Sequence, residues 1–573
     1  MAIWNRASTS SSDEPKVARD AEFGKTDYEA NASYDPAEGE VHQQTGEKQN
    51  LHRGLEARHI TMIAIGGAIG TGLIIGTGKA LAQSGPASIL ISYSFVGLLV
   101  FAVMAGLGEM AAWLPLGSGF SGYANRFVDP ALGFALGYTY WFKYIIVTPN
   151  QLTAAALVIQ YWVSPEKINP GVFITVFFVA IVCINYFGVK FFGEFEFWLS
   201  SLKVVIIIAL IILSLILALG GGPTHDRTGF RYWKNPGAFK PYIDEGSAGK
   251  FLGFWSSMIN AVFAYLGTEL VGVTVGEAQN PRRTIPKAIK LTFFRILFFY
   301  CLSVLLLGMI VPSDSDDLAF ANKKSNSAAA SPFVVAIKIA QIDALPGILN
   351  GCILLFVFSA SNSDLYIASR TIYGLASTGK APKFLARTDK RGVPVYALGV
   401  SSCFCLLAYM NVSDDSKKVF GYFVNLVTIF GLLTWISILV THIYFVKARE
   451  AQNVPKESLA YVSPFGIWGS YISLGFCILI ALTKNFSVFT HSEEYGDFDY
   501  KNFITGYLGI PLYLIMIVGW KWWHKTEGIK ATEADLWTGK DIIDREEQEF
   551  LAQQAANNKG EKTFYSRFVS WLF

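Results

Sequence analysis

A succession of apolar stretches, each about 20 residues long, fills the sequence between residues 60 and 522. A helix rises about 1.5 Å per residue, so about 20 apolar residues cross the roughly 30 Å hydrocarbon core of a bilayer. The predicted fold class is therefore an all-α integral membrane protein. We expect twelve transmembrane helices, one from each of these stretches: 60–82, 86–114, 133–161, 171–189, 197–220, 251–275, 288–311, 347–376, 393–410, 418–446, 463–484 and 503–522.

Composition excludes several other classes of protein. Charged residues make up 16% of the chain and hydrophobic residues 52%, whereas soluble proteins average about 25% charged residues. The net charge of +3 lacks the basicity that nucleic-acid binding needs. The six cysteines lie in apolar stretches, so we expect small buried hydrophobic residues rather than disulfides. Because neither a Walker loop nor an HExxH motif occurs, we expect no enzyme activity, metal or cofactor, and a gradient as the energy source.

The polar segments suggest how the chain is organised. Residues 1–50 bury too little apolar surface to fold alone, and we expect a disordered cytosolic tail. Residues 51–446 form the predicted ten-helix core, residues 447–522 add helices 11 and 12, and residues 523–573 form a second cytosolic tail. An even number of crossings places both tails on one side, and basic clusters beside the membrane favour the cytoplasm: Arg282, Arg283, Lys287, Lys290, Lys380, Lys383, Arg387, Lys390 and Arg391.

Two predicted spans contain helix-weakening sequences. The first reads IGGAIGTG at residues 65–72, and each Gly costs about 1 kcal/mol of helix stability relative to Ala. The sixth reads AYLGTELVG at residues 264–272. Interrupted spans five helices apart are typical of two inverted repeats, here at about 60–220 and 251–446, with a binding site between them. The alternative for the first span is that its small residues only allow close helix packing.

A break in a membrane helix exposes backbone groups that can bind a zwitterion. Free N–H groups at a helix start attract an anion without using a full charge. We expect a substrate carboxylate at the first break and an ammonium group at carbonyls of the second, with two aromatic residues serving either as a lid or as packing. The candidates are Ile69, Gly70, Thr71 and Gly72 in span one, and Phe263, Tyr265 and Gly267 in span six.

Charged residues inside the predicted spans each cost roughly 2.5 to 3.5 kcal/mol on insertion scales, and four of them are the main candidates for a function. Glu269 lies in the suspected break and is a candidate proton carrier, the alternative being a structural hydrogen bond to backbone. Lys203 is interpreted either as a fixed cation in place of a sodium ion or as a lysine that snorkels to the interface. Glu109 is interpreted as structural. Lys143 belongs to a polar group in span three.

That polar group contains one cation and two amides. Asn150 lies seven residues after Lys143 and returns to nearly the same helix face, with Gln151 beside it. Such a surface suits an anionic ligand; the alternative is an ion pair between Lys143 and an acid elsewhere in the chain. Span eight adds further polar residues, from which we take Ser359 and Asn362 as substrate-binding candidates: Ser359, Ser361, Asn362, Ser363 and Asp364.

These motifs resemble the yeast amino acid transporter family of the amino acid–polyamine–cation superfamily. The resemblance covers nearly everything after residue 50, and its branch is the one that takes dicarboxylic amino acids. It rests on GGAIGTGL (66–73), PNQLTAAALVIQYW (149–162), FGEFEFWLSSLKV (192–204), GTELVGVTVGEAQNPRRTIPKAI (267–289), SASNSDLYIASRTIYGLA (359–376) and DREEQEF (544–550).

The resemblance implies a LeuT-type core of ten helices plus two, and proton symport in which Glu269 and Lys203 take part. Many relatives carry Glu where Gln151 stands and a neutral residue where Lys143 stands, so both departures favour an anionic substrate. The expected function is import of L-glutamate and L-aspartate across the fungal plasma membrane, with ubiquitin-ligase machinery acting on the tails. The alternatives are a broader neutral amino acid permease or exchanger, and an amino-acid-sensing receptor.

Overall fold

The computed structural model describes residues 70–557 except 117, 165, 188, 274–280, 319–330, 413–415 and 491–495. The predicted tail at residues 1–50 and the candidate Ile69 lie outside the described residues. Within the described ranges the secondary structure is helical, without a β-strand, which confirms the all-α fold class.

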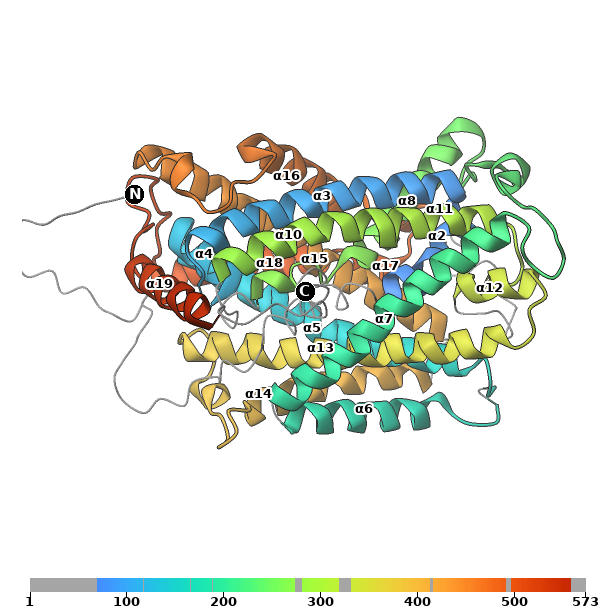
Figure 1. Cartoon of the computed structure of the whole chain (residues 1–573), viewed down its shortest axis with the longest axis horizontal. Coiled ribbons are helices and arrows are strands. Elements are labelled where there is room, and N and C mark those ends of the chain that lie inside the picture. Colours follow the sequence, from blue (N-terminus) through green and yellow to red (C-terminus); the bar gives the residue numbers. More distant parts are fainter. Residues whose placement is uncertain are drawn as a thin grey trace, which may run out of the picture. The chain divides into compact units, whose positions relative to one another are not determined.

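Helices follow one another along the whole described chain and are labelled in Figure 1. The amino-terminal half contains η1 (Gly72–Gly76), α2 (Thr77–Ser84), α3 (Pro86–Trp113), α4 (Gly119–Phe127), α5 (Pro130–Ile159), α6 (Pro170–Tyr186), α7 (Val189–Ala218) and η2 (Trp233–Gly237). The next part contains α8 (Gly246–Tyr265), α9 (Leu270–Val273), α10 (Pro281–Arg295), η4 (Ile296–Leu302), α11 (Ser303–Ile310), α12 (Pro332–Ile339), α13 (Leu345–Ser377) and η5 (Lys383–Ala386). The remainder contains α14 (Val395–Phe404), η6 (Cys405–Val412), α15 (Ser416–Ala451), η7 (Lys456–Ser458), α16 (Gly466–Thr483), η8 (Phe486–Phe489), α17 (Tyr500–Tyr507), α18 (Gly509–His524) and α19 (Lys540–Asn557).

The described helices account for all twelve predicted stretches. Seven are long and apolar enough to cross a membrane, and α17 with α18, bent by 41°, makes an eighth candidate. The helix α6 and the pair α14–η6 are shorter apolar helices. The last two stretches correspond to η1–α2 and α8–α9, which are the two that the sequence predicts to be interrupted.

Two spanning helices begin at the same local signal. Pro130 and Pro170 occupy the first helical position of α5 and α6, where a missing N–H costs nothing. The preceding Asp129 and Asn169 each accept a hydrogen bond from a backbone N–H of the first turn. The sequence thus specifies where these helices start, and with them the register of the polar residues on α5.

The helix α5 is packed against several neighbours. Both α13 and α15 run along it, and α18 and α6 also contact it; Figure 1 shows α5 and α13 extending side by side. Because its surface is covered by protein, polar side chains on α5 must find partners on those helices or remain available for a ligand.

The sixth span is interrupted, as predicted. The helix α8 ends at Tyr265, a turn follows, and α9 begins at Leu270. Gly267 has φ of +96° in this turn, a conformation that other residues rarely adopt. Two backbone segments also meet here, because a Cβ on Gly72 would lie 2.4 Å from the Cα of Ala264.

The described part of the first span begins at its expected break. Helical backbone starts at Thr71, and the N–H of Ile74 donates to the carbonyl of Gly70 at 3.4 Å. The preceding glycines lie outside the described residues. The two inverted repeats stay a prediction.

The expectation that all six cysteines are buried is wrong. Cys405 and Cys477 are buried, but Cys183 and Cys403 are exposed on the surface of the protein, and Cys301 and Cys352 are partly exposed. An apolar stretch in a membrane helix has a lipid-facing side, so apolar sequence does not imply burial in protein. All six are free thiols.

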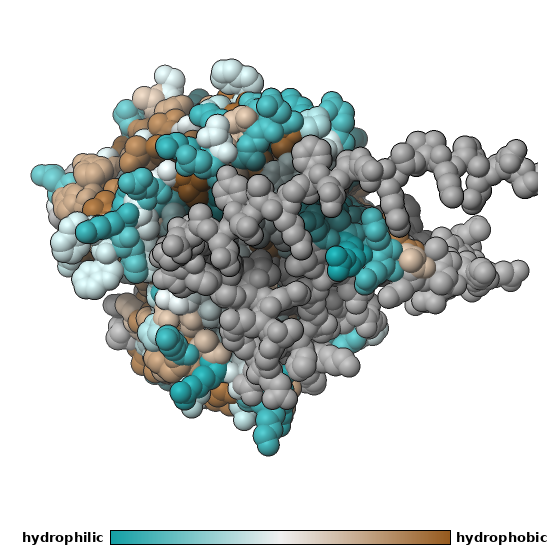
Figure 2. All heavy atoms as spheres, turned by 90° about the vertical axis from the view of Figure 1, so that its left-hand side faces the viewer, coloured by the Kyte–Doolittle hydropathy of each residue, from teal (hydrophilic) through white to brown (hydrophobic). Residues whose placement is uncertain are grey.

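The segment after α18 packs on the ends of several spanning helices. Arg126 of α4 forms an ion pair with Asp535 at 2.6 Å, and the indole of Trp113 donates to the carbonyl of Leu536 at 2.9 Å. Arg282 of α10 pairs with Glu547 of α19 at 2.8 Å. Figure 2 views the side on which α19 lies and shows hydrophilic side chains gathered there.

Candidate functional site

Lys143 and Glu269 form an ion pair deep inside the protein. Lys143 comes from α5 and is 1% exposed, and Glu269 comes from the turn of the sixth span and is fully buried. The two oxygens of Glu269 also accept hydrogen bonds from the backbone N–H of Gly267 and the indole N–H of Trp435, each at 3.3 Å. The carboxylate therefore joins α5, the helix break and α15.

The ammonium of Lys143 lies among aromatic rings. Its Nζ is 5.2 Å from the ring centre of Tyr140 and 4.6 Å from that of Tyr144, which adds cation–π attraction. The sequence left open whether Lys143 awaits an anionic ligand or pairs with an acid of the chain. An acid is in contact, and it is Glu269, the candidate proton carrier.

A second buried ion pair lies within α7 and is linked to α13 by a serine hydroxyl. The Nζ of Lys203 lies 3.5 Å from Oε1 of Glu196, and both side chains are buried. The same oxygen accepts hydrogen bonds from the hydroxyls of Ser200 at 2.9 Å and Ser359 at 2.7 Å. The interpretation of Lys203 as a snorkelling residue is wrong in this structure, because Lys203 is 1% exposed and its ammonium turns to an internal acid. Ser359, a substrate-binding candidate, donates its hydroxyl to Glu196, and its role toward a substrate stays a prediction.

One amide side chain contacts a third carboxylate, and other amides lie on the same helices. Gln151 of α5 donates from Nε2 to Oδ2 of Asp364 on α13 at 3.3 Å. Asn362, two residues before Asp364 on α13, accepts from Nδ2 of Asn185 at 3.0 Å. Both side-chain polar atoms of Asn150 are buried without a hydrogen-bond partner. Unpaired buried amides are costly, so Asn150 has free capacity to bind a polar ligand.

Five charged residues thus lie near one another, and we call them the central charge cluster: Lys143, Lys203, Glu196, Glu269 and Asp364. Asp364 lies within electrostatic range of both lysines and of Glu196. The cluster contains more acids than bases. The positive charge of Arg295 on α10 also interacts electrostatically with Glu269.

The first span contacts α8 through η1 and contributes a buried hydroxyl beside it. The hydroxyl of Thr71 is buried and has no hydrogen-bond partner. Thr71 and Gly72 begin the helical part of the first span that the structure describes. The anion-binding role of this segment stays a prediction.

The two candidate lid residues are held by packing. Tyr265 stacks on Tyr300 with ring centres 4.3 Å apart, and its hydroxyl donates to the carbonyl of Tyr93 at 2.9 Å. Phe263 packs edge-on against Phe420 at 6.1 Å. These contacts favour the packing alternative for Tyr265 in this conformation.

Glu109 lies in a separate polar cluster. It accepts a hydrogen bond from the backbone N–H of Ser463 at 2.8 Å and lies 3.3 Å from Nε2 of His442. His442 in turn contacts the hydroxyl of Ser470 through Nδ1 at 2.8 Å. The cluster ties α3 and α15 to α16, in keeping with the structural role expected for Glu109.

Sequence reasoning missed three residues of the site. Glu196 lies seven residues before Lys203 and hence on the same helix face, a spacing that could have identified it as the partner. Arg295 lies within a predicted span and is 3% exposed. The cost of placing a charge inside a membrane span, by which the other charged residues were selected, could have identified it as well. Trp435 gave no signal, because an aromatic residue in an apolar helix is common.

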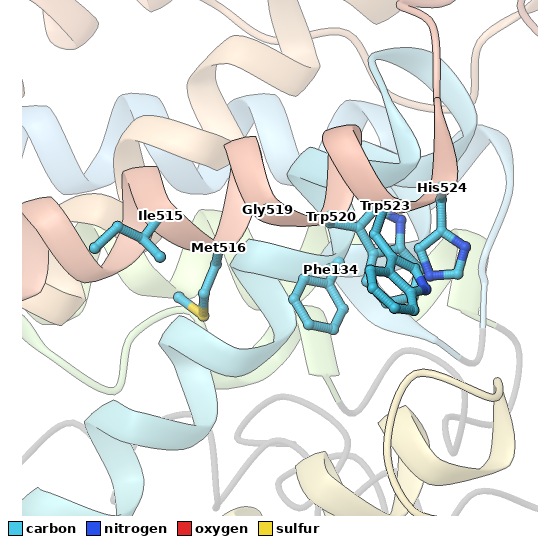
Figure 3. Close-up of a pocket in the computed structure, with 7 residues that line it drawn as sticks. All are labelled: Phe134, Ile515, Met516, Gly519, Trp520, Trp523 and His524. Carbon is cyan, nitrogen blue, oxygen red and sulfur yellow. The ribbon is translucent and has the colours of Figure 1, made fainter.

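An open pocket of about 380 Å³ lies elsewhere, between α5 and α18 (Figure 3). Its aromatic residues are stacked: Phe134 on Trp520 at 4.1 Å, and Trp520 on His524 at 3.9 Å. Trp523 also lines it. Aromatic side chains of this kind are enriched where membrane helices meet the interface. None of its lining residues belongs to the central charge cluster.

Buried charges held at a broken helix inside an all-helical membrane protein define the class as a polytopic membrane transporter. The amino acid permease family model matches residues 59–529. The chain belongs to this family and is an amino acid transporter, which confirms the resemblance found in the sequence.

Its relatives include the dicarboxylic amino acid permease of Saccharomyces cerevisiae, 56% identical over 92% of this chain and 87% of that protein. An uncharacterized amino-acid permease of Schizosaccharomyces pombe is 46% identical over 86% of this chain and 92% of that protein. Among solved structures, a nucleobase-cation-symport-1 family transporter in a closed conformation with bromovinylhydantoin bound gives a TM-score of 0.48 at 16% identity. That match covers 86% of this chain and 96% of the other.

Proposed function

We propose that the protein imports acidic amino acids, L-glutamate and L-aspartate, across the plasma membrane together with protons. The observation that carries this proposal is the contact between Lys143 and Glu269 at the break in the sixth span. The 56% identity to a dicarboxylic amino acid permease supports the same substrate class.

The ion pair suggests how substrate and proton are coupled. As long as Glu269 is ionised, it occupies the ammonium of Lys143. A proton that enters from outside neutralises Glu269 and weakens this contact, so the side-chain carboxylate of the substrate takes its place on Lys143. Proton and substrate then favour each other's binding, because both act on the same ammonium.

The remaining groups of the substrate are assigned to the two broken spans. The first-turn N–H groups and the free hydroxyl of Thr71 bind the α-carboxylate. Carbonyls at the end of α8, between Phe263 and Gly267, bind the α-ammonium. Gln151, Asn150, Ser359 and Asn362 line the side-chain region, and Lys203 holds the neighbouring Glu196 in place.

Transport follows by alternating access. The two predicted repeats, at about 60–220 and 251–446, rock around the site and expose it first outside and then inside. In this proposal both termini are cytoplasmic, where ubiquitin-ligase machinery reaches the tails.

Reconstitution tests the proposal. Purified protein in liposomes should concentrate radiolabelled glutamate when the outside is made acidic, and dissipating the pH difference should stop accumulation. Exchange of glutamate without net uptake would indicate an exchanger, preference for neutral amino acids would indicate a broader permease, and binding without flux would indicate a receptor. Each of these outcomes contradicts the proposed function.

A further inference from the structure

Asp364 is a partly buried carboxylate on α13 that the proposed mechanism leaves without a task. Each ammonium of the central charge cluster contacts a different acid: Lys143 contacts Glu269, and Lys203 lies 3.5 Å from Glu196. In the part of the chain that the structure describes, Asp364 has no ion-pair contact and accepts one amide hydrogen bond, from Gln151 at 3.3 Å.

The charged and titratable groups that face Asp364 come from two neighbouring helices. Lys143, Tyr140 and Tyr144 face it from α5, and Lys203 and Glu196 face it from α7. The lysines attract its negative charge, and Glu196 repels it. When the substrate carboxylate takes the place of Glu269 on Lys143, this ammonium stays compensated by another acid, and Asp364 gains no cation of its own.

The amide of Gln151 can pair with a protonated carboxyl group through both of its polar atoms, Nε2 and Oε1. Its Nε2 already donates to Asp364, while its Oε1 is buried with no hydrogen-bond partner. An ionised carboxylate cannot donate a hydrogen bond, but a carboxylic acid can. With a proton on Oδ1, Asp364 would donate to Oε1 and still accept from Nε2, which satisfies both ends of the amide.

We propose that Asp364 is a specificity-determining residue that carries a second proton when an acidic amino acid is bound. The proton comes from the external solution, forms an O–H bond with the carboxylate, and is released to the cytosol when the substrate leaves. The inference rests on the proposed function, in which Glu269 carries the first proton. One glutamate of charge −1 then moves with two protons, so one positive charge enters per glutamate.

The experiment compares wild type, Asp364→Asn and a control in liposomes held at a fixed membrane potential. Asn keeps the size of Asp364 and the hydrogen bond to Gln151 but cannot bind the proton. The control is Asp226→Asn, which changes an exposed acid that pairs with Arg231 outside the spans. Radiolabelled glutamate uptake and the electrical current are recorded together.

The wild type and the control should carry one positive charge per glutamate, so an inside-negative potential accelerates their uptake. Asp364→Asn should be electroneutral, and its glutamate uptake should not respond to the potential. An unchanged charge ratio in Asp364→Asn overturns the inference, as does electroneutral uptake by the wild type. A wild type that does not concentrate glutamate with protons contradicts the proposed function instead.

A second measurement covers an Asp364→Asn variant that folds but does not transport. Glutamate binding in detergent should take up two protons from a weakly buffered solution in wild type and one in the variant; equal uptake overturns the inference. If Asp364→Asn does not fold, Gln151→Met removes the acceptor Oε1. Its apparent affinity for glutamate should then fall more at pH 7 than at pH 5, and an equal loss at both values overturns the inference.

Discussion

Replacing Lys143 by Gln removes the ammonium that, in the proposed mechanism, first contacts Glu269 and then the side-chain carboxylate of the substrate. Gln keeps much of the length of the side chain and can still donate a hydrogen bond to Glu269. The variant should weaken binding of glutamate far more than binding of glutamine, because only glutamate presents a charged side chain to position 143.

The magnitude follows from the buried setting of Lys143. A unit charge pair at about 4 Å contributes about 4 kcal/mol at an effective dielectric of 20. Both groups lose hydration when they meet, and we take about half of this energy as the net effect. A net loss of about 2 kcal/mol corresponds to roughly a 30-fold weaker affinity for glutamate. The side chain of glutamine is neutral and forms no charge pair with Lys143, so the affinity for glutamine should change by less than about threefold.

The assay is inhibition of labelled glutamate uptake by unlabelled glutamate and by glutamine in liposomes. Because Lys143→Gln leaves Glu269 without its ion-pair partner, thermal stability is measured in parallel. The double variant with Glu269→Gln should recover part of any stability lost, since it removes the uncompensated buried charge. Equal factors for glutamate and glutamine would refute charge recognition at Lys143.

Three further changes test other parts of the structure. Glu269→Gln should abolish accumulation driven by a proton gradient while glutamate binding persists, and unchanged accumulation would remove Glu269 from coupling. Gly72→Leu should lose transport, because even a Cβ would lie 2.4 Å from the Cα of Ala264; wild-type uptake and affinity would contradict the close approach of the first and sixth spans. Burial alone would raise the pKa of Asp535, but hydrogen bonds from Thr538 and Arg126 outweigh it and hold this pKa below its ordinary value of 3.8. The stability that Asp535 contributes is therefore present above pH 3.8 and is lost as the pH falls through the lowered pKa. Proteolysis of the segment after α18 should increase in that pH window. The increase should be smaller in Arg126→Gln, because this variant already lacks the contact with Asp535.

Much of the architecture could be predicted from the sequence. A bilayer requires about 20 apolar residues for each helical crossing, so the spans can be read directly. The break in the sixth span was predicted in the same way, because glycines and a carboxylate at membrane depth are inconsistent with an unbroken lipid-facing helix. The structure places that break between Tyr265 and Leu270.

The burial of the cysteines could not be predicted in this way. Cys183 and Cys405 both lie in apolar stretches, yet one is exposed and the other buried. A membrane helix has apolar residues toward lipid and toward protein alike, so hydropathy does not distinguish its two sides. Only the packing of neighbouring helices does.

The sequence by itself determined that this chain spans a membrane, which residues carry charge inside it, and where a span breaks. Only the tertiary structure decided how the charges on different helices pair. Glu269 lies 126 residues from Lys143 in the chain, and Asp364 lies 213 residues from Gln151. Pairing across such separations depends on which helices pack together, and hydropathy and local spacing contain no information about that choice.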